Sequence, residues 1–242
     1  DPLAARYYTG HVTLSPGRRR RTRTITPRER VLVALAHRQP DVTPWQIDLT
    51  IDAYNQTAAY LGDPDFYPKL GNHLAGAEDG YFVEVRPNFW QDQFGIVWNR
   101  TIDKDIGNVH EYLIKEPDIT TYQFPEPDLE RDAQLWQGLI DQHPDQFRFG
   151  GIGFSMFERA WTLRGMENLL CDMVLHPQFV DDLLDKILEY NLKVLDQIVQ
   201  YDLDCIRFGD DWGQQNGLIM GPKLWRRFIK PRVAIMYQKV KD

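Results

Sequence analysis

The clearest candidate for chemistry in this 242-residue sequence is a pair of adjacent carboxylates, Asp210 and Asp211. They follow residues 203–209, an apolar run that predicts a buried strand. Functional groups of parallel sheets gather where the strands end, and a carboxylate there can act as a general acid or base or hold a cation. We therefore predict both as catalytic residues. A solvated turn is the alternative interpretation.

Side chains alternate along a strand, so we expect only one of these two carboxylates to face the site. The other would pair with Arg207 or cap the next turn.

Two further predicted strand ends carry residues suited to substrate binding. Residues 150–155 are rich in glycine, which lets the backbone approach a ligand closely, but they lack a nucleotide-binding fingerprint. Asp48 lies near the end of a predicted strand over 42–49, where capping a helix is an equal alternative. Together with aromatic and cationic neighbours, these positions give the predicted substrate-binding residues Asp48, Phe154, Trp161, Arg207 and Trp212.

Local spacing excludes several other chemistries. The six histidines form no HxH or HExxH arrangement, and the GxSxG motif of serine hydrolases is missing. The two cysteines, Cys171 and Cys205, are too far apart for a CxxC motif, and we expect two buried thiols. No metal site can be assembled from the sequence, so its ligands stay unknown.

The elements that must position these residues alternate between helix and strand. Helices are predicted over residues 26–37, 51–61, 128–143, 177–201 and 222–228, the last interrupted or restarted at Pro231, and strands over 42–49, 81–86, 147–154 and 203–209. This order predicts an α/β fold with a parallel sheet and crossover helices. The aromatic pieces at 89–101 and 110–114 predict an inserted antiparallel hairpin.

Composition predicts a cytoplasmic enzyme. The net charge of −7 argues against nucleic-acid binding, and no stretch approaches the roughly 20 apolar residues that span a membrane. The first residues lack the pattern of a secretory signal. Residues 1–25 contain Arg18 to Arg21 without apolar periodicity, which predicts a flexible basic arm, and residues 26–242 are expected to form one domain.

A resemblance to a known family rests on four segments: TPRERVLVALAHRQPDVTP at 26–44, WQDQFGIVW at 90–98, GIGFSMFERAWTLRGMENLL at 151–170 and FGDDWGQQNGLIMGPKLWRRFIKP at 208–231. They are similar to the uroporphyrinogen decarboxylase superfamily, and most to its decarboxylase-like and corrinoid methyltransferase branches. The resemblance implies a (β/α)8 TIM-type barrel. Only four core strands are predicted here, so we expect the chain to stop before the barrel is complete.

The resemblance also implies a choice of reaction. True uroporphyrinogen decarboxylases carry an arginine-rich loop after the first strand, whereas this chain has IDLTIDAYN at 47–55. Their substrate-contacting tyrosine and serine correspond to Trp161 and Asp210 here. A polycarboxylate substrate would be repelled by Asp48, Asp52 and Asp210. The better match is cobalamin-dependent methyl transfer from a small methylated or methoxylated donor.

The resemblance implies zinc and a corrinoid as cofactors, with the zinc ligands expected beyond Asp242. The expected partners are a small-molecule substrate and a corrinoid carrier protein, and a homodimer is one option for the assembly. Two alternatives stay open. One is uroporphyrinogen decarboxylation, which needs no cofactor. The other is a non-catalytic barrel fragment whose exposed core is covered by a partner chain.

Overall fold

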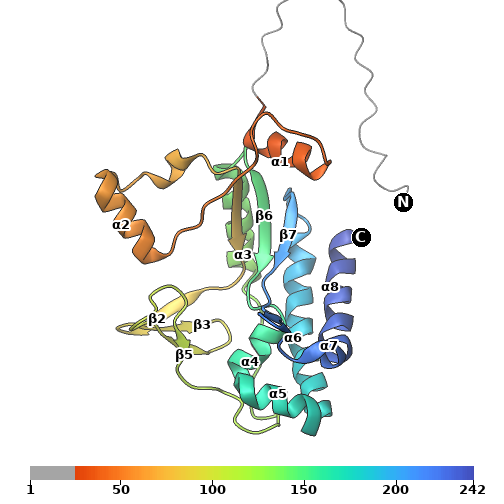
Figure 1. Cartoon of the computed structure of the whole chain (residues 1–242). Helices are drawn as coiled ribbons and strands as arrows, with labels where there is room; N and C mark the ends of the chain where they lie inside the picture. Colours follow the sequence, from red (N-terminus) through yellow and green to blue (C-terminus); the bar gives the residue numbers. More distant parts are fainter. Residues whose placement is uncertain (1–24) are drawn as a thin grey trace, which may run out of the picture.

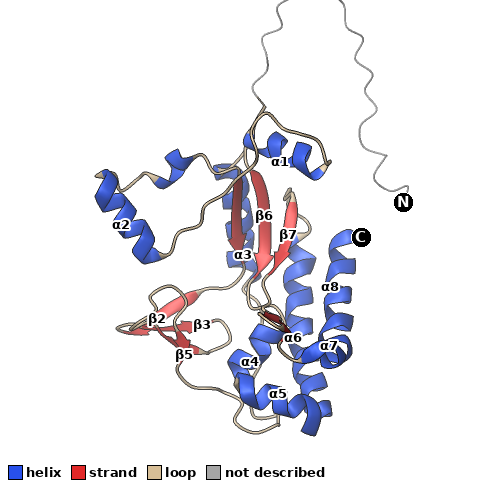
Figure 2. Cartoon of the chain, in the orientation of Figure 1, coloured by secondary structure: helices blue, strands red, loops and turns tan. Residues whose placement is uncertain are grey.

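The computed structural model describes residues 25–242, and a parallel sheet of three strands lies at its centre (Figures 1 and 2). The strands are β1 (Leu74–Glu78), β6 (Phe147–Ile152) and β7 (Cys205–Phe208), in that order across the sheet. Helices connect them, which confirms the predicted α/β class. The described residues contain three parallel strands rather than a closed barrel.

The described part of the chain also contains eight α-helices. They are α1 (Pro27–Leu35), α2 (Ile51–Leu61), α3 (Leu129–Gln142), α4 (Phe157–Arg164), α5 (Met166–Leu175), α6 (Pro177–Ile198), α7 (Gly221–Leu224) and α8 (Lys230–Lys241). The helices predicted at 26–37, 51–61, 128–143 and 177–201 are confirmed, with small differences at their ends. α6 carries the broadest apolar stripe and forms the centre of the hydrophobic core.

The two faces of the parallel sheet differ. Toward one face, α3 contacts β1 and β6, and Ile198 of α6 lies against Gly150. The opposite face, here called the open face, borders a cavity of about 460 Å³ lined by Phe149, Cys205 and Arg207 among others. On this face the Arg207 guanidinium lies 4.7 Å from the centre of the Phe149 ring. The same ring fills the space that a side chain at Gly76 would occupy.

A second, antiparallel sheet lies beside the carboxyl edge of the first (Figure 1). Its strands are β2 (Phe82–Arg86), β3 (Phe89–Asp92), β4 (Val97–Asn99) and β5 (Asn108–Val109). This confirms the inserted antiparallel hairpin at 89–101, whereas the piece predicted at 110–114 is not a strand and the chain pairs instead through β5 just before it. The strand predicted at 81–86 is present, but it belongs to this sheet and not to the parallel one. A small hairpin of β8 (Gly213–Gln214) and β9 (Gly217–Leu218) follows β7.

The predicted strand over residues 42–49 is wrong, because this segment is neither helix nor strand. Its backbone makes one bond to the strand region, from His73 N to Trp45 O at 3.0 Å. The backbone of Ile47 bonds to the Asn72 side chain and not to a neighbouring strand. Asn72 Oδ1 accepts the Ile47 N–H at 3.1 Å, and Asn72 Nδ2 donates to the Ile47 carbonyl at 3.2 Å. Apolar and polar residues therefore alternate in this segment, but no neighbouring strand in the described part of the chain pairs with it.

α1 is fixed to the amino end of β7 by an ion pair. Arg28 Nη2 lies 2.5 Å from Asp204 Oδ1, and Asp204 also accepts the backbone N–H of Arg148. Thr26 and Glu29 form the predicted capping box that starts this helix. The capped helix is therefore attached to the sheet by a buried carboxylate.

Several smaller expectations need correction. Cys171 and Cys205 are exposed and not buried, because one lies on the outer side of α5 and the other on the open face. Pro231 lies in the first turn of α8, so of the two alternatives predicted for it the restart of the helix is confirmed; a π-helical turn, Trp225–Ile229, comes between α7 and α8. The predicted basic arm lies outside the described residues except for Ile25. No helix within residues 25–242 is long and apolar enough to cross a membrane.

Candidate active site

A cavity of about 240 Å³ lies where β1 and β6 end. The carboxyl edge of the parallel sheet lines one side of it, and residues of the antiparallel sheet and its turns, among them Phe82 and Gln93, line another. Three aromatic rings, two carboxyl groups, one amide and one guanidinium line it, from the residues Glu78, Asp79, Gly80, Tyr81, Phe82, Gln93, Gly153, Phe154 and Arg159. An apolar pocket with a few convergent polar groups at strand ends is the expected form of a small-molecule site.

Asp79 is the most unusual group in this cavity. It follows β1 directly, and its backbone N–H donates to Gly151 O at 2.9 Å. Its Oδ1 atom is buried and has no hydrogen-bond partner within residues 25–242. Burial, and next the negative charge of Asp132, raise the pKa of Asp79 to about 7, against the opposing effect of Arg159. Near neutral pH this carboxyl can therefore both give and take a proton.

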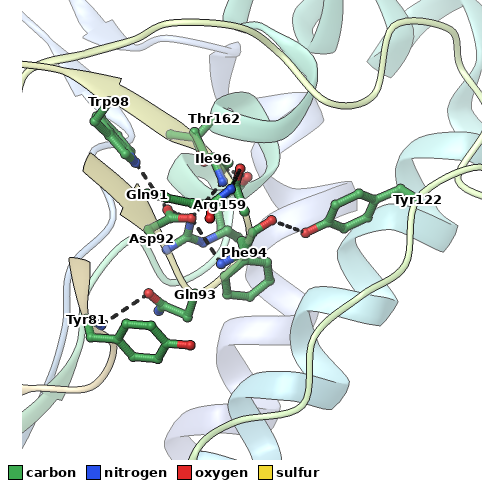
Figure 3. Close-up of polar contacts among 11 residues, drawn as sticks. Tyr81, Gln91, Asp92, Gln93, Phe94, Ile96, Trp98, Tyr122, Arg159 and Thr162 are labelled. Atoms are coloured by element: carbon green, nitrogen blue, oxygen red, sulfur yellow. Dashed lines mark hydrogen bonds and ion pairs between the residues drawn. The ribbon is translucent and has the colours of Figure 1, made fainter. Parts of the chain in front are cut away.

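Arg159 places a buried positive charge in the cavity wall (Figure 3). The residue is 3% exposed, and its Nη1 donates to Asp92 Oδ2 at 2.6 Å. Asp92 also accepts the backbone N–H groups of Phe94 and Ile96, both at 3.0 Å, and the indole N–H of Trp98 at 3.2 Å. This buried network fixes α4 to the antiparallel sheet and so fixes the position of the guanidinium.

Phe154 forms another wall in a strained conformation. Its φ is 50°, in the left-handed region that side chains other than glycine rarely adopt. Its ring lies 5.2 Å from that of Trp98 and 5.4 Å from the Arg159 guanidinium. Backbone strain of this kind is found mainly where the surrounding structure holds a functional side chain in place.

A second acidic group lies where β7 ends. Asp210 accepts the backbone N–H groups of Phe157 at 3.1 Å and Glu158 at 2.8 Å, and also the indole N–H of Trp212. It thereby caps the first turn of α4. Burial and then the charges of Asp211 and Asp210 raise the pKa of Glu158 to about 7. Asp211 itself is exposed.

Comparison with known proteins places this fold in a family. The family model described as uroporphyrinogen decarboxylase (URO-D) matches residues 101–242. The chain belongs to this family. Among solved structures, a methyltransferase from Methanosarcina mazei has a TM-score of 0.63 and 15% sequence identity over 90% of this chain and 68% of that one. At this identity the likeness shows a shared fold. No protein of curated function matches the chain in sequence.

The predicted site residues of this URO-D family member lie in different places. Phe154 lines the cavity, and Asp210, Asp211 and Trp212 lie together at the start of α4. Trp161 lies on α4 and is partly buried against the core. Arg207 does not pair with Asp210 or Asp211: its Nη2 contacts Glu78 Oε1 at 2.5 Å, across the open face. Their roles in binding and catalysis stay predictions.

Asp48 lies outside the cavity of Asp79. It lines a cavity of about 500 Å³ beside the amino end of β1 and also, together with Arg207, the cavity of about 460 Å³ on the open face, and it accepts from Gln46 Nε2 at 2.8 Å. It is not a helix cap, because the Thr50 side chain caps α2. The substrate-binding role predicted for Asp48 therefore concerns a different cavity from that of Asp79.

Sequence reasoning missed Asp79 and Arg159. Asp79 was overlooked because β1 was not recognised as a strand; a strand over 74–78 would have placed Asp79 at a strand end. Arg159 gives no local signal, since its partner Asp92 lies 67 residues away in sequence. The spacing of neither residue could have indicated that they share a cavity.

The zinc implied by the family has no ligand set in the described part of the chain. No group of three or more His, Cys, Asp or Glu side chains within residues 25–242 is arranged to hold a metal. Cys171 on α5 and Cys205 on the open face lie on different elements and do not share a site. We therefore assign no chemical step to a metal.

Proposed function

We propose that this URO-D family member transfers a methyl group from a small methylated or methoxylated donor to a corrinoid held by a carrier protein. The donor would occupy the cavity at the ends of β1 and β6. The observation that carries this proposal is the Asp79 carboxyl, which is buried in that cavity without a partner for Oδ1 and has a pKa of about 7. The fold shared with a methyltransferase supports it.

The residues of this chain supply a proton in such a reaction. When a methyl group leaves oxygen, nitrogen or sulfur, the heteroatom gains an electron pair and becomes basic. Asp79 is placed to donate its proton to that atom, a form of general acid catalysis. The positive charge of Arg159, which already lowers the pKa of Asp79, then stabilises the carboxylate that remains. The corrinoid would supply the nucleophile.

The cavity also favours a small donor over a tetrapyrrole. Pockets for drug-sized ligands measure about 300–1,000 Å³, and this cavity, at about 240 Å³, falls below that range. The guanidinium in its lining, Arg159, is already bound to Asp92, so it offers little positive charge for the several carboxylates of uroporphyrinogen. Uroporphyrinogen decarboxylation, which the family name suggests, is therefore the second candidate.

A methyl-transfer assay tests the proposal. The protein is mixed with cob(I)alamin and a panel of methylated amines, thiols and methoxylated compounds, and methylcobalamin is followed by its absorbance. We expect turnover of at least one donor and a roughly 100-fold or greater loss in Asp79→Asn. Asp141→Asn, an exposed carboxylate on α3, is the matched control and should retain full activity.

Two outcomes would overturn the proposal. One is the absence of transfer from every donor in the panel. The other is an Asp79→Asn variant as active as the wild type. Formation of coproporphyrinogen from uroporphyrinogen by the same preparation would establish the second candidate in its place.

A further inference from the structure

Asp132 occupies a position where the helix should carry an apolar residue. The buried residues of α3 are Asp132, Trp136 and Leu139, which follow the spacing of a core-facing stripe. Asp132 is 2% exposed, and within residues 25–242 it forms one ion pair, with the neighbouring Arg131 at 3.2 Å. A buried carboxylate with so few partners lowers the stability of the fold, which indicates that Asp132 has a role other than packing.

The side of α3 that carries Asp132 packs toward the candidate active site. α3 contacts both β1, which Asp79 follows, and α6, which carries Tyr190. Asp132 raises the pKa of Asp79, and both carboxylates raise the pKa of Tyr190, after the larger effect of burial in each case. These three elements bring two carboxyl groups and a phenol within electrostatic range of one another. Arg131 connects Asp132 to the cavity of Asp79, because it contacts both Asp132 and the Tyr81 ring.

The other charged groups around this cluster are few. Arg159 faces it from α4, Glu78 from β1, and Asp128 and Arg131 from the start of α3. Glu78 and Asp128 are exposed, whereas Arg131 is half-buried, with its guanidinium 5.2 Å from the centre of the Tyr81 ring, which lines the cavity. Arg131 therefore stands between Asp132 and solvent.

We propose that Asp132 is a positioning residue for Asp79: the two carboxyls form a buried acid pair that holds a single proton. Burial raises the pKa of Asp132, and the bound Arg131 cation opposes this effect. With that cation 3.2 Å away, Asp132 is the ionised member, and its negative charge keeps the proton on Asp79. Two neighbouring carboxyls in a poorly solvated site cannot both ionise near neutral pH. When Asp79 gives its proton to a substrate, one proton must return from solvent to restore the pair.

This pair supports the proposed function, since Asp79 is the acid in it, but its existence can be tested without any substrate. Carbon NMR of the side-chain carboxyls follows the titration of Asp79 and Asp132. In Asp132→Asn we expect the titration midpoint of Asp79 to fall by about one pH unit or more. In Asp79→Asn the midpoint of Asp132 should stay nearly unchanged, because Asp79 is still neutral in the wild type while Asp132 ionises.

A second variant keeps both carboxyls and covers the case in which Asp132→Asn does not fold. Arg131→Gln removes the cation that favours ionised Asp132, so the midpoint of Asp132 should rise. Asp141→Asn on the same helix is the control and should move neither midpoint. An unchanged Asp79 midpoint in folded Asp132→Asn would overturn the pair, as would an unchanged Asp132 midpoint in Arg131→Gln.

The methyl-transfer assay and the titration fail independently. Coupled midpoints in a protein that transfers no methyl group would leave the acid pair standing and remove the proposed function. If methyl transfer depends on Asp79 but the Asp79 midpoint is the same with and without Asp132, the proposed function stands and the acid pair is removed.

Discussion

The carboxylate of Asp210 accepts the backbone N–H of Glu158 at 2.8 Å, and this bond joins the end of β7 to the first turn of α4. The residue that follows Glu158 in that turn is Arg159, whose guanidinium lines the candidate active site. An aspartate predicted to do chemistry therefore also holds a helix in place. The loop after β7 thus influences a cavity formed at the ends of β1 and β6.

Replacement of Asp210 by alanine should destabilise the protein. The variant leaves the N–H groups of Phe157 and Glu158 without their acceptor, and loss of such a cap costs roughly 1–2 kcal/mol. Urea unfolding followed by circular dichroism measures the change. Asp211→Ala is the control, because this exposed neighbour caps nothing, and it should change stability by less than about 0.5 kcal/mol. Equal effects of the two variants would contradict the capping role.

Removal of the Arg159 charge should have a larger effect. Arg159→Met keeps a long side chain beside Phe94 but leaves Asp92 as a buried carboxylate without its cation, at a cost of about 3–5 kcal/mol. The double variant Arg159→Met with Asp92→Asn removes both charges and should recover part of that loss. Chemical unfolding of the wild type and the three variants gives the coupling free energy. A coupling near zero would show that the pair does not fix α4 to the antiparallel sheet.

The elements with strong periodicity were predictable from the sequence, and those that depend on distant partners were not. α6 carries its own apolar stripe, so its existence follows from residues 177–198 alone. β1 reads LAGAE, and its small residues give no alternating signal, because their size is set by the Phe149 ring on the neighbouring strand. The strand pattern at 42–49 is present in the sequence, yet no neighbouring strand pairs with it.

In the candidate site, too, local patterns were predictable from the sequence and contacts between distant residues were not. The cavity lies at strand ends, and Phe154, predicted at such an end, lines it. Asp79 was missed together with its strand. The pairing of Asp92 with Arg159 and the placement of Asp132 beside the cavity are tertiary contacts that residue spacing does not encode.

Gly76 should not tolerate a side chain. A Cβ atom there would lie 2.0 Å from the Phe149 ring, which would have to leave its place on the open face. Overpacking of this kind costs about 1–3 kcal/mol, so Gly76→Ala should lower the unfolding midpoint in urea. Gly138 on α3 is the matched control. A Cβ there meets only the Gln142 side chain, at 3.9 Å, so Gly138→Ala should stabilise the helix by about 0.5–1 kcal/mol. Two changes of the same sign would contradict the packing at Gly76.

Stability should fall as the pH rises from about 4 to 7. The pKa of Asp79 is raised from 3.8 to about 7 and that of Glu158 from 4.5 to about 7, so the folded protein binds these protons more tightly than the unfolded chain. Between the two values the folded state therefore carries more protons, and the free energy of unfolding decreases with increasing pH until both groups are ionised.

Asp79→Asn tests this assignment directly, because asparagine does not titrate. Urea unfolding at half-unit intervals between pH 4 and pH 8 should show a shallower decline in the variant than in the wild type. The variant should also be relatively more stable above pH 7, where the wild type must keep a buried Asp79 ionised. Parallel pH profiles for the two proteins would show that Asp79 titrates at an ordinary pKa, and Asp79 would then lose its assignment as the proton donor.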